Sequence, residues 1–399
     1  MIILINHNIS EITMAQITMK WIWQHENYPN FSYDKECLSE KLKRVEFLRG
    51  QVSGILSLAN KKEFDEIEIT NLTNEIMNTS QIEGEYLRRD SVRDSVAKAI
   101  NSACISSENM STRHTDDLTA LMLDCHRNNE LLSIERLHGW HNALFANSGG
   151  YEGIKKINIA LFRDYDDMKV VENVFNRAGV VVKYLAPPHN LLKKDIDALI
   201  KYCNESKDDP YIKSALAHLW FVSIHPYDDG NGRISRAIAD YVLSKDLKEE
   251  HKTYSMSTTI YTKRAQYYEM LDDTTNLHKN RNFDFTKWIE WNIDVSITTL
   301  EKAYEDVLFI VKKTKFWDRC KMLKLSKEHS IFLDDFINKI FKGENNEFAN
   351  ADYREITKTI PVTANRQIMK LLKYGLIEKI EGKDGRSTSY RILFDVKSN

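Results

Sequence analysis

The chain has 399 residues, of which 42% are hydrophobic and 29% charged, so it holds enough apolar material for two or three packed units of a globular protein. Its formal net charge of −2 excludes a protein that coats nucleic acid with its whole surface, and a nucleic-acid role would need a local basic patch. The 14 glycines and 6 prolines are too few for the many tight turns of a sandwich or barrel, which favours helices.

Hydropathy and cysteine spacing indicate the environment of the protein. No stretch approaches the roughly 18 consecutive apolar residues of a membrane-spanning helix. The opening residues, MIILINHNISEIT, lack the basic start and the small-residue cleavage site of a secretory signal. The five cysteines form neither a CxxC pair nor a Cys/His zinc pattern. We therefore expect a cytoplasmic protein with reduced cysteines and no membrane partner.

Apolar periodicity predicts helices over most of residues 20–147. One helical pattern begins at Leu38, and two amphipathic segments separated by Gly84 extend from Phe64 to about Ile100. Residues 112–147 carry two further helical patterns. Residues 149–192 differ, because a glycine pair, β-branched runs and two consecutive prolines predict a loop or a short hairpin there.

Helices are expected to resume at Leu191 and to continue to about Lys312. The remaining residues are expected to form a separate unit. Its predicted elements are three helices, 328–341, 353–359 and 363–374, followed by strand-like runs at 376–380 and 387–393. Three helices followed by a hairpin are the element order of a winged helix.

The segment His225 to Arg236, HPYDDGNGRISR, is the most informative in the chain. Apolar helical patterns precede and follow it, so it is predicted to be a tight loop between two helices. Its central residues, Gly230, Asn231 and Gly232, can adopt positive φ and let backbone N–H groups converge beside the positive end of the second helix. This arrangement predicts an anion site.

The side chains of this segment match the needs of nucleotidyl transfer. Arg233 and Arg236 are three apart, so both can grip phosphate oxygens from the first helical turn. Asp229 is a hard oxygen ligand suited to Mg²⁺ shared with phosphates. His225 can take a proton from an incoming hydroxyl. A lone His or GxG is usually structural, and no strand precedes this loop, which excludes a dinucleotide fold; the whole set together favours catalysis.

HPYDDGNGRISR resembles the Fic family signature, HPFx(D/E)GNGRxxR, with Tyr227 in place of the usual Phe. The resemblance implies a mainly α fold with a short β-hairpin flap. It implies His225 as general base, Asp229 as the Mg²⁺ ligand, and Gly230, Asn231, Gly232 and Arg233 as the phosphate cradle. Arg236 would hold the γ-phosphate of ATP.

A second signal lies upstream of the signature. Ile69, Leu72, Ile76, Thr79 and Glu83 share one helical face, so Glu83 falls on a stripe that ought to be buried, where a carboxylate needs a partner. Gly84 then ends the helix. TSQIEG, Thr79 to Gly84, resembles the inhibitory motif (S/T)xxxE(G/N) of one class of Fic proteins. The resemblance implies that Glu83 pairs with Arg236 and keeps ATP from binding productively.

WIWQ with the following turn at Pro29, together with IEGE and AHLWF, resembles a bacterial Fic subgroup and extends the resemblance to nearly the whole chain. Met168, Lys169, Val170 and Val171 resemble the flap that aligns the target protein, and Tyr268 stands where similar proteins contact the nucleotide base, although a packed helix face explains this tyrosine nearly as well. The implied domains are an N-terminal helical domain (1–110) with an inhibitory helix at about 67–84, a Fic core (111–315) and a winged-helix-like domain (316–399).

The C-terminal domain offers a local basic patch. Residues 321–399 hold fifteen Lys and Arg against eleven Asp and Glu, and the third predicted helix carries Arg366, Lys370 and Lys373 without an acid. This helix could enter a DNA major groove, with Lys383 and Arg386 on the wing near a phosphate. Packing or dimerisation through the same unit is the alternative.

The resemblance predicts a protein adenylyltransferase that moves AMP from ATP to Ser, Thr or Tyr hydroxyls of a protein, which could be the enzyme itself, with Mg²⁺ as cofactor and Glu83 as restraint. Two alternatives stay open. The same site could remove AMP from a modified protein, or the chain could be a DNA-binding winged-helix regulator whose Fic core serves as a sensor. The sequence leaves the target protein and a homo-oligomeric state open.

Overall fold

The computed structural model describes residues 21–101, 109–148, 151–152, 155–173, 180–341, 343–383, 385 and 388–394. Most of these residues lie in helices, and the strands form small two- and three-stranded sheets. The expected mainly α fold with a short hairpin is therefore confirmed. Within the described ranges, no helix has the length and apolar character that a membrane crossing requires.

The chain divides into two compact units. Unit 1 comprises residues 1–51 and 64–301, and unit 2 comprises residues 52–63 and 302–399. These limits differ from the domain limits expected from the sequence, because the first hundred residues fall largely within the unit that contains the signature. The last long helix, α11 (Thr286–Lys321), also runs past the expected helix end at Lys312 and past the expected limit at residue 315.

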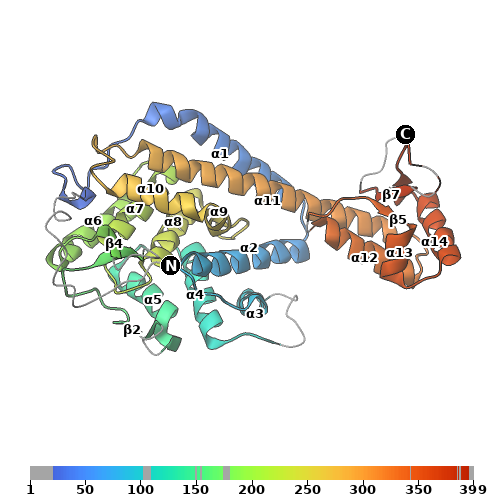
Figure 1. Cartoon of the computed structure of the whole chain (residues 1–399), viewed down its shortest axis with the longest axis horizontal. Coiled ribbons are helices and arrows are strands. Elements are labelled where there is room, and N and C mark those ends of the chain that lie inside the picture. Colours follow the sequence, from blue (N-terminus) through green and yellow to red (C-terminus); the bar gives the residue numbers. More distant parts are fainter. Residues whose placement is uncertain are drawn as a thin grey trace. The chain divides into compact units, whose positions relative to one another are not determined.

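Unit 1 is a bundle of helices around the signature (Figure 1). Its helices in chain order include α1 (Lys35–Leu56), α2 (Lys61–Ile82), α3 (Arg89–Ala99), α4 (Arg113–Arg127), α5 (Ile134–Phe145), α6 (Leu192–Glu205), α7 (Pro210–Ile224), α8 (Asn231–Leu247), α9 (Met256–Thr262) and α10 (Arg264–Thr275). Short 3-10 turns η2 (Ile22–Gln24), η3 (Ala146–Ser148) and η4 (His189–Leu191) join some of them.

The helices α7 and α8 pack against each other at the centre of unit 1. The residues of α7 from Tyr211 to Phe221 are all buried, because this helix is apolar on almost every side and is covered by neighbours all round. Asp209 caps its first turn and Pro210 occupies the position where a missing N–H does no harm. The loop between α7 and α8 is therefore fixed at both ends by buried helices.

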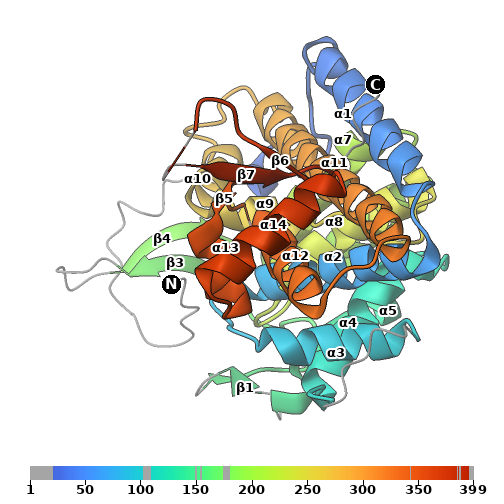
Figure 2. The ribbon, with the colours of Figure 1, turned by 90° about the vertical axis from the view of Figure 1, so that its right-hand side faces the viewer.

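Two other features complete unit 1. The strands β3 (Lys169–Asn173) and β4 (Val180–Leu185) lie side by side in Figure 2 and pair antiparallel. Their register is irregular between Val170 and Val171. A smaller pair is formed by β1 (Tyr151–Glu152) and β2 (Lys155–Lys156). Along the outside, α1 is joined to the first part of α11 by ion pairs from Lys41 to Glu290 and Asp294.

Unit 2 has its own core, built around aromatic residues such as Phe316, Phe332 and Tyr353. Its elements after α11 are α12 (Lys327–Phe341), β5 (Phe348–Ala349), α13 (Asn350–Thr357), α14 (Pro361–Lys373), β6 (Ile377–Lys379) and β7 (Ser389–Ile392). The strands form one antiparallel sheet in the order β5-β7-β6 beside the three helices (Figure 2). The short β5 was not expected from the sequence.

Candidate active site

His225 sits at the C-terminal end of α7 in a left-handed conformation, with φ 50° and ψ 57°. This conformation is uncommon for a residue with a side chain and turns the chain sharply out of the helix. The ring Nδ1 lies 3.0 Å from the carbonyl oxygen of Val222, which can only accept, so Nδ1 carries the proton and Nε2 is the basic nitrogen. The residue is only 8% exposed, yet it borders a wide cleft of unit 1.

The loop that carries His225 is braced from behind by Arg163, which is 3% exposed. Its guanidinium donates to the carbonyl oxygens of His225 (2.9 Å), Tyr165 (2.7 Å) and Pro187 (2.5 Å). One cation thus satisfies buried carbonyls from three segments and holds the unusual turn in place. Sequence reasoning missed Arg163, because nothing in its local pattern distinguishes it from a surface arginine.

Tyr227 and Asn231 fix the rest of the loop. Tyr227 is fully buried, stacks on His141 at a ring-centroid distance of 4.1 Å and bonds to His138 through its hydroxyl (2.9 Å). Asn231 accepts from the Tyr227 N–H and donates to the Tyr227 carbonyl oxygen. The side chain of Asn231 therefore braces the loop, and Asn231 also borders the cleft as the first residue of α8.

The two neighbouring aspartates of the loop have different surroundings. Asp228 is 4% exposed and accepts from the backbone N–H and side chain of Asn158 and from the hydroxyl of Tyr165. Asp229 borders the cleft and accepts from the Gly230 N–H at 2.6 Å. Asp228 thus holds the loop to Asn158 and Tyr165, whereas Asp229, the expected Mg²⁺ ligand, borders the cleft.

Gly230 and Gly232 are required for different reasons. Gly230 has φ 76°, and a Cβ there would meet the ring of Phe145 at 2.8 Å. Gly232 lies within α8, so the expected positive φ was wrong for Gly232 and for Asn231, because the helix already begins at residue 231. A Cβ on Gly232 would clash with Glu83 Oε1. Gly232 therefore allows a carboxylate to approach the helix start closely.

Arg236 is held by the end of α2. Its Nη2 lies 2.8 Å from Glu83 Oε1 and 2.9 Å from the carbonyl oxygen of Thr79, and its Nε donates to Thr79 Oγ1 at 2.8 Å. Burial alone lowers the pKa of Arg236, but the charge of Glu83 outweighs it and the pKa is raised. Thr79, Glu83 and Arg236 thus lie in direct contact, the arrangement that the resemblance to the inhibitory motif implies.

Arg233 is held by a second carboxylate that the sequence analysis did not consider. Its Nη1 lies 2.7 Å from Glu85 Oε2, and its guanidinium carbon lies 4.9 Å from the ring centroid of Phe145. The other oxygen of Glu85 lies 2.9 Å from Nε2 of His114, in the first turn of α4. The charge pattern of the sequence could have indicated this contact. Two carboxylates, Glu83 and Glu85, flank Gly84, and two arginines of the signature need partners when they are buried.

The cleft beside these residues has a volume of about 740 Å³. Its walls come from the end of α2 (Glu83), the β3–β4 hairpin (Val170, Lys183, Tyr184), the signature and α10. Tyr267 and Tyr268 both border it. Tyr268 donates its hydroxyl to the carbonyl oxygen of Ile82 (3.0 Å), and the buried Tyr267 bonds to His218 (2.9 Å). Of the four expected flap residues, Val170 borders the cleft, Lys169 and Val171 belong to β3, and Met168 is buried just before it.

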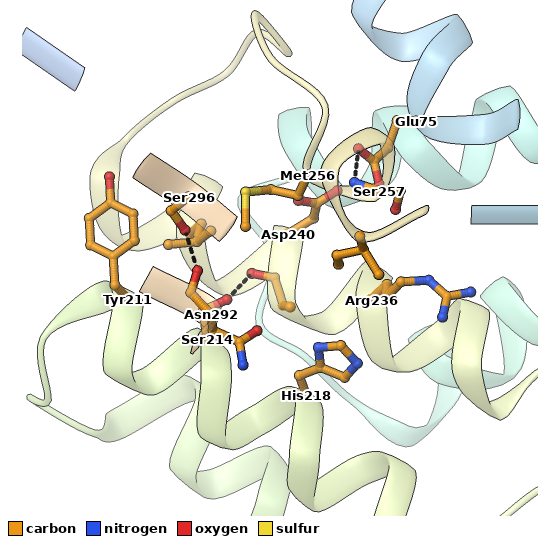
Figure 3. A pocket seen from close by; sticks show the side chains of 13 residues that line it. Glu75, Tyr211, Ser214, His218, Arg236, Asp240, Met256, Ser257, Asn292 and Ser296 are labelled. Atoms are coloured by element: carbon orange, nitrogen blue, oxygen red, sulfur yellow. Dashed lines mark hydrogen bonds between the residues drawn. The ribbon is translucent and has the colours of Figure 1, made fainter. Parts of the chain in front are cut away.

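A small polar cavity of about 20 Å³ lies behind Arg236, with Glu75, His218 and Asp240 around it (Figure 3). Lys252, which is buried, lies 2.7 Å from Asp240 and 3.7 Å from Glu75, and Glu75 also accepts from Ser255. Burial lowers the pKa of His218 to about 3, so it stays neutral beside Arg236. These buried charges bind α2 to α8 independently of Glu83.

In unit 1 a histidine, an aspartate and two arginines lie around the start of one buried helix, α8. Residues 131–243 match the model of the Fic/DOC family, and residues 21–101 match a domain of unknown function, DUF4172. Over residues 131–243 the chain is therefore similar to the Fic/DOC family.

The chain is similar to other proteins of this kind. It is 32% identical over 98 residues to a Fido domain-containing protein of Dictyostelium discoideum, a match that covers 22% of this chain and 66% of that protein. A Fic domain containing signaling protein from Bacteroides thetaiotaomicron shares the fold, with a TM-score of 0.50 and 13% identity over 68% of this chain and 97% of that one. A Fic family protein from Desulfovibrio desulfuricans aligns with a TM-score of 0.45 and 15% identity, over 89% of this chain and 97% of that chain.

Proposed function

We propose that this chain transfers AMP from ATP to a Ser, Thr or Tyr hydroxyl of a protein and that Glu83 restrains the transfer. Proteins of the Fic family generally transfer a nucleoside monophosphate to proteins. The observation that supports the proposal most is that His225, Asp229 and Arg233 border one cleft at the N-terminus of α8. Its volume of about 740 Å³ lies within the range typical of sites for small molecules.

Arg236 supports the phosphate assignment in a second way. Its Nη1 is buried and has no hydrogen-bond partner among the described residues, although its other two nitrogens are bonded to α2. A buried guanidinium N–H without a partner is unfavourable, so a ligand oxygen at this place would be bound strongly. The triphosphate would bind at the start of α8 once the carboxylate of Glu83 moves aside.

The chemistry follows from these positions. The hydroxyl oxygen of the target attacks the α-phosphorus of ATP, and Nε2 of His225 takes its proton. The bond between the α-phosphorus and the oxygen that bridges to the β-phosphate breaks, pyrophosphate leaves, and AMP stays on the target as a phosphodiester. Backbone N–H groups of α8 and both arginines stabilise the phosphate charge as it shifts. The hydrogen bond from Nδ1 to Val222 keeps the imidazole oriented and supports the positive charge it gains.

A transfer assay tests this proposal. Purified protein, with and without the Glu83→Gly change, is incubated with Mg²⁺, with candidate target proteins and with ATP labelled at the α- or the γ-phosphate. Label from the α-phosphate on the target or on the enzyme itself supports AMP transfer. Label from the γ-phosphate would instead indicate kinase chemistry and reject the proposal. Loss of label from a previously modified protein would favour the removal of AMP, with Glu83 orienting a water.

Mg²⁺ fits the site through Asp229. Among the described residues no cluster of three or more His, Cys, Asp or Glu could hold a metal, so the ion would share one carboxylate with the phosphates, as Mg²⁺ often does. Bound there, it would neutralise phosphate charge. We expect Asp229→Asn to raise the Mg²⁺ concentration for half-maximal transfer at least about tenfold, because it removes one charged ligand, while the melting temperature stays unchanged.

The neighbouring aspartate is the matched control. Asp228→Asn should leave the Mg²⁺ requirement unchanged and lower the free energy of unfolding by about 1.5–3 kcal/mol, because it weakens charge-assisted bonds to Asn158 and Tyr165. Metal titrations and urea melts of the two variants measure both quantities. The assignment of Asp229 as the Mg²⁺ ligand fails if Asp228→Asn raises the Mg²⁺ requirement and Asp229→Asn leaves it unchanged.

DNA binding by unit 2 is a second proposal, favoured by one face of α14. The order of helices and strands in unit 2 supports this proposal, since in a winged helix the third helix reads the major groove. The exposed residues of α14 include Arg366, Lys370 and Lys373, and no acid lies in this helix. Lys383 pairs with Glu347, which weakens its expected role on the wing, and Arg386 lies outside the described residues.

Replacing Arg366, Lys370 and Lys373 together with alanine should weaken binding of duplex DNA and reduce the salt slope of the binding constant by up to about 2.7. The control is the triple alanine variant of three exposed lysines of α6, Lys193, Lys194 and Lys201. Equal binding by both variants, or no binding by the parent, would favour a packing role for unit 2.

A further inference from the structure

Glu85 connects three parts of unit 1 and is not part of the inhibitory motif. It follows Gly84, whose φ of 91° ends the helix, and its N–H donates to the carbonyl oxygen of Ser80. One carboxylate oxygen bonds to Arg233 of α8 and the other to His114 of α4. Both oxygens therefore have a charged or polar partner, and the side chain is fixed at both ends.

The position of Glu85 differs from that of Glu83. Glu83 borders the cleft, where its Oε1 is 2.8 Å from Arg236 and close to the Cα of Gly232. Arg233 also borders the cleft, but neither Glu85 nor His114 does. Glu85 therefore reaches Arg233 from outside the space that a nucleotide would fill. A phosphate in the cleft would have to displace Glu83, but not Glu85.

The contacts of Glu85 are those of an ionised, ordered carboxylate. Burial would raise the pKa of Glu85, but the hydrogen bond from His114 and the charge of Arg233 outweigh it, and the pKa is lowered. Arg233 is 4% exposed and lies over the ring of Phe145 on another side. An arginine side chain held by a carboxylate and a ring has already lost most of its rotamer freedom, so binding a phosphate orders it no further.

We propose that Glu85 is a positioning residue that holds the guanidinium of Arg233 ready for phosphate, so that it acts in the opposite direction to Glu83, two residues earlier. The inference rests on the proposed role of Arg233 in binding the phosphates of the nucleotide. It gives the segment from Glu83 to Glu85 two separate tasks: one carboxylate blocks the second arginine of the signature, and the other prepares the first.

Nucleotide affinity tests the inference. In the Glu83→Gly background, Glu85→Gln should raise the dissociation constants of ATP and ADP at least about tenfold, because the amide cannot accept from both partners with the strength of a carboxylate. The affinity for adenosine, which has no phosphate, should stay within about twofold. Calorimetry or a ligand-detected titration gives these constants. His114→Gln should act in the same direction but less, since Glu85 keeps its bond to Arg233.

Two controls separate this role from a general loss of structure. Glu66→Gln removes a comparable charge from the half-buried ion pair between Glu66 of α2 and Arg93 of α3 and should change no affinity. In an Arg233→Ala background, Glu85→Gln should have no further effect on ATP or ADP affinity, since it acts through that arginine. A melting temperature for each variant shows that it is folded.

Three outcomes would overturn the inference: unchanged ATP and ADP affinity, tighter nucleotide binding as expected of a second brake, or an equal loss of adenosine affinity. Failure of the proposed AMP transfer is a separate result, because these measurements require binding and no turnover. A protein that binds ATP in the predicted Glu85-dependent way but transfers no label would keep this inference and reject the activity.

Discussion

Replacing His225 with alanine in the Glu83→Gly background is expected to lower the rate of AMP transfer by about 10² to 10⁴, the usual contribution of a general base. The hydroxyl of a target side chain is a weak nucleophile until its proton is removed, and Nε2 is the ring nitrogen left to accept it when Nδ1 donates to Val222. Initial rates with α-labelled ATP measure the effect.

The same variant should keep its affinity for ATP, since the phosphates are expected to bind to α8 and the arginines. An exposed histidine, His278, provides the control, and His278→Ala should leave the rate unchanged. If His225→Ala retained more than about a tenth of the parent rate, another group would have to be the base.

Replacing Glu83 with glycine is expected to raise the rate of AMP transfer by roughly 5- to 150-fold, which corresponds to a coupling free energy of 1–3 kcal/mol. The carboxylate of Glu83 holds Arg236 and lies against Gly232, so it competes with a phosphate for the same donors. Its removal leaves α2 in place, because the buried pairs of Glu75, Asp240 and Lys252 still join that helix to the core.

The control for this change is Gln81→Gly, which places the same flexible residue in the same last turn of α2 without removing a charge. It should leave the transfer rate near that of the parent. Equal activation by both variants would mean that loosening the helix end, and not loss of the carboxylate, relieves the restraint. No activation of Glu83→Gly on any target would reject autoinhibition.

The helices were predictable because their apolar spacing is a local property. The last turn of α2, the end of α7 and the start of α8 follow from apolar runs that meet Gly84, His225 and Gly230, and the short hairpin follows from its β-branched runs. The helix α11 was longer than expected because its later residues, among them Phe316, are buried in a second core, and no local pattern reveals which core a residue joins.

Several site residues could be placed from sequence because they lie within twelve consecutive positions. The spacing from His225 to Arg236 puts a base, a carboxylate and two arginines around one helix start, whatever surrounds it. The pairing of Glu83 with Arg236 was expected only through the resemblance, since 153 positions separate the two residues in the chain.

The sequence by itself determined the chemical groups of this protein and their order along two helices, because short-range spacing fixes which residues share a turn. Only the tertiary structure decided how these groups are used. It assigned Asp228 to the scaffold and Asp229 to the cleft, placed Arg163 behind the loop that carries His225 and set Glu85 against Arg233. These contacts join residues far apart in the chain, and burial and hydrogen-bond satisfaction select them only once all the helices have packed.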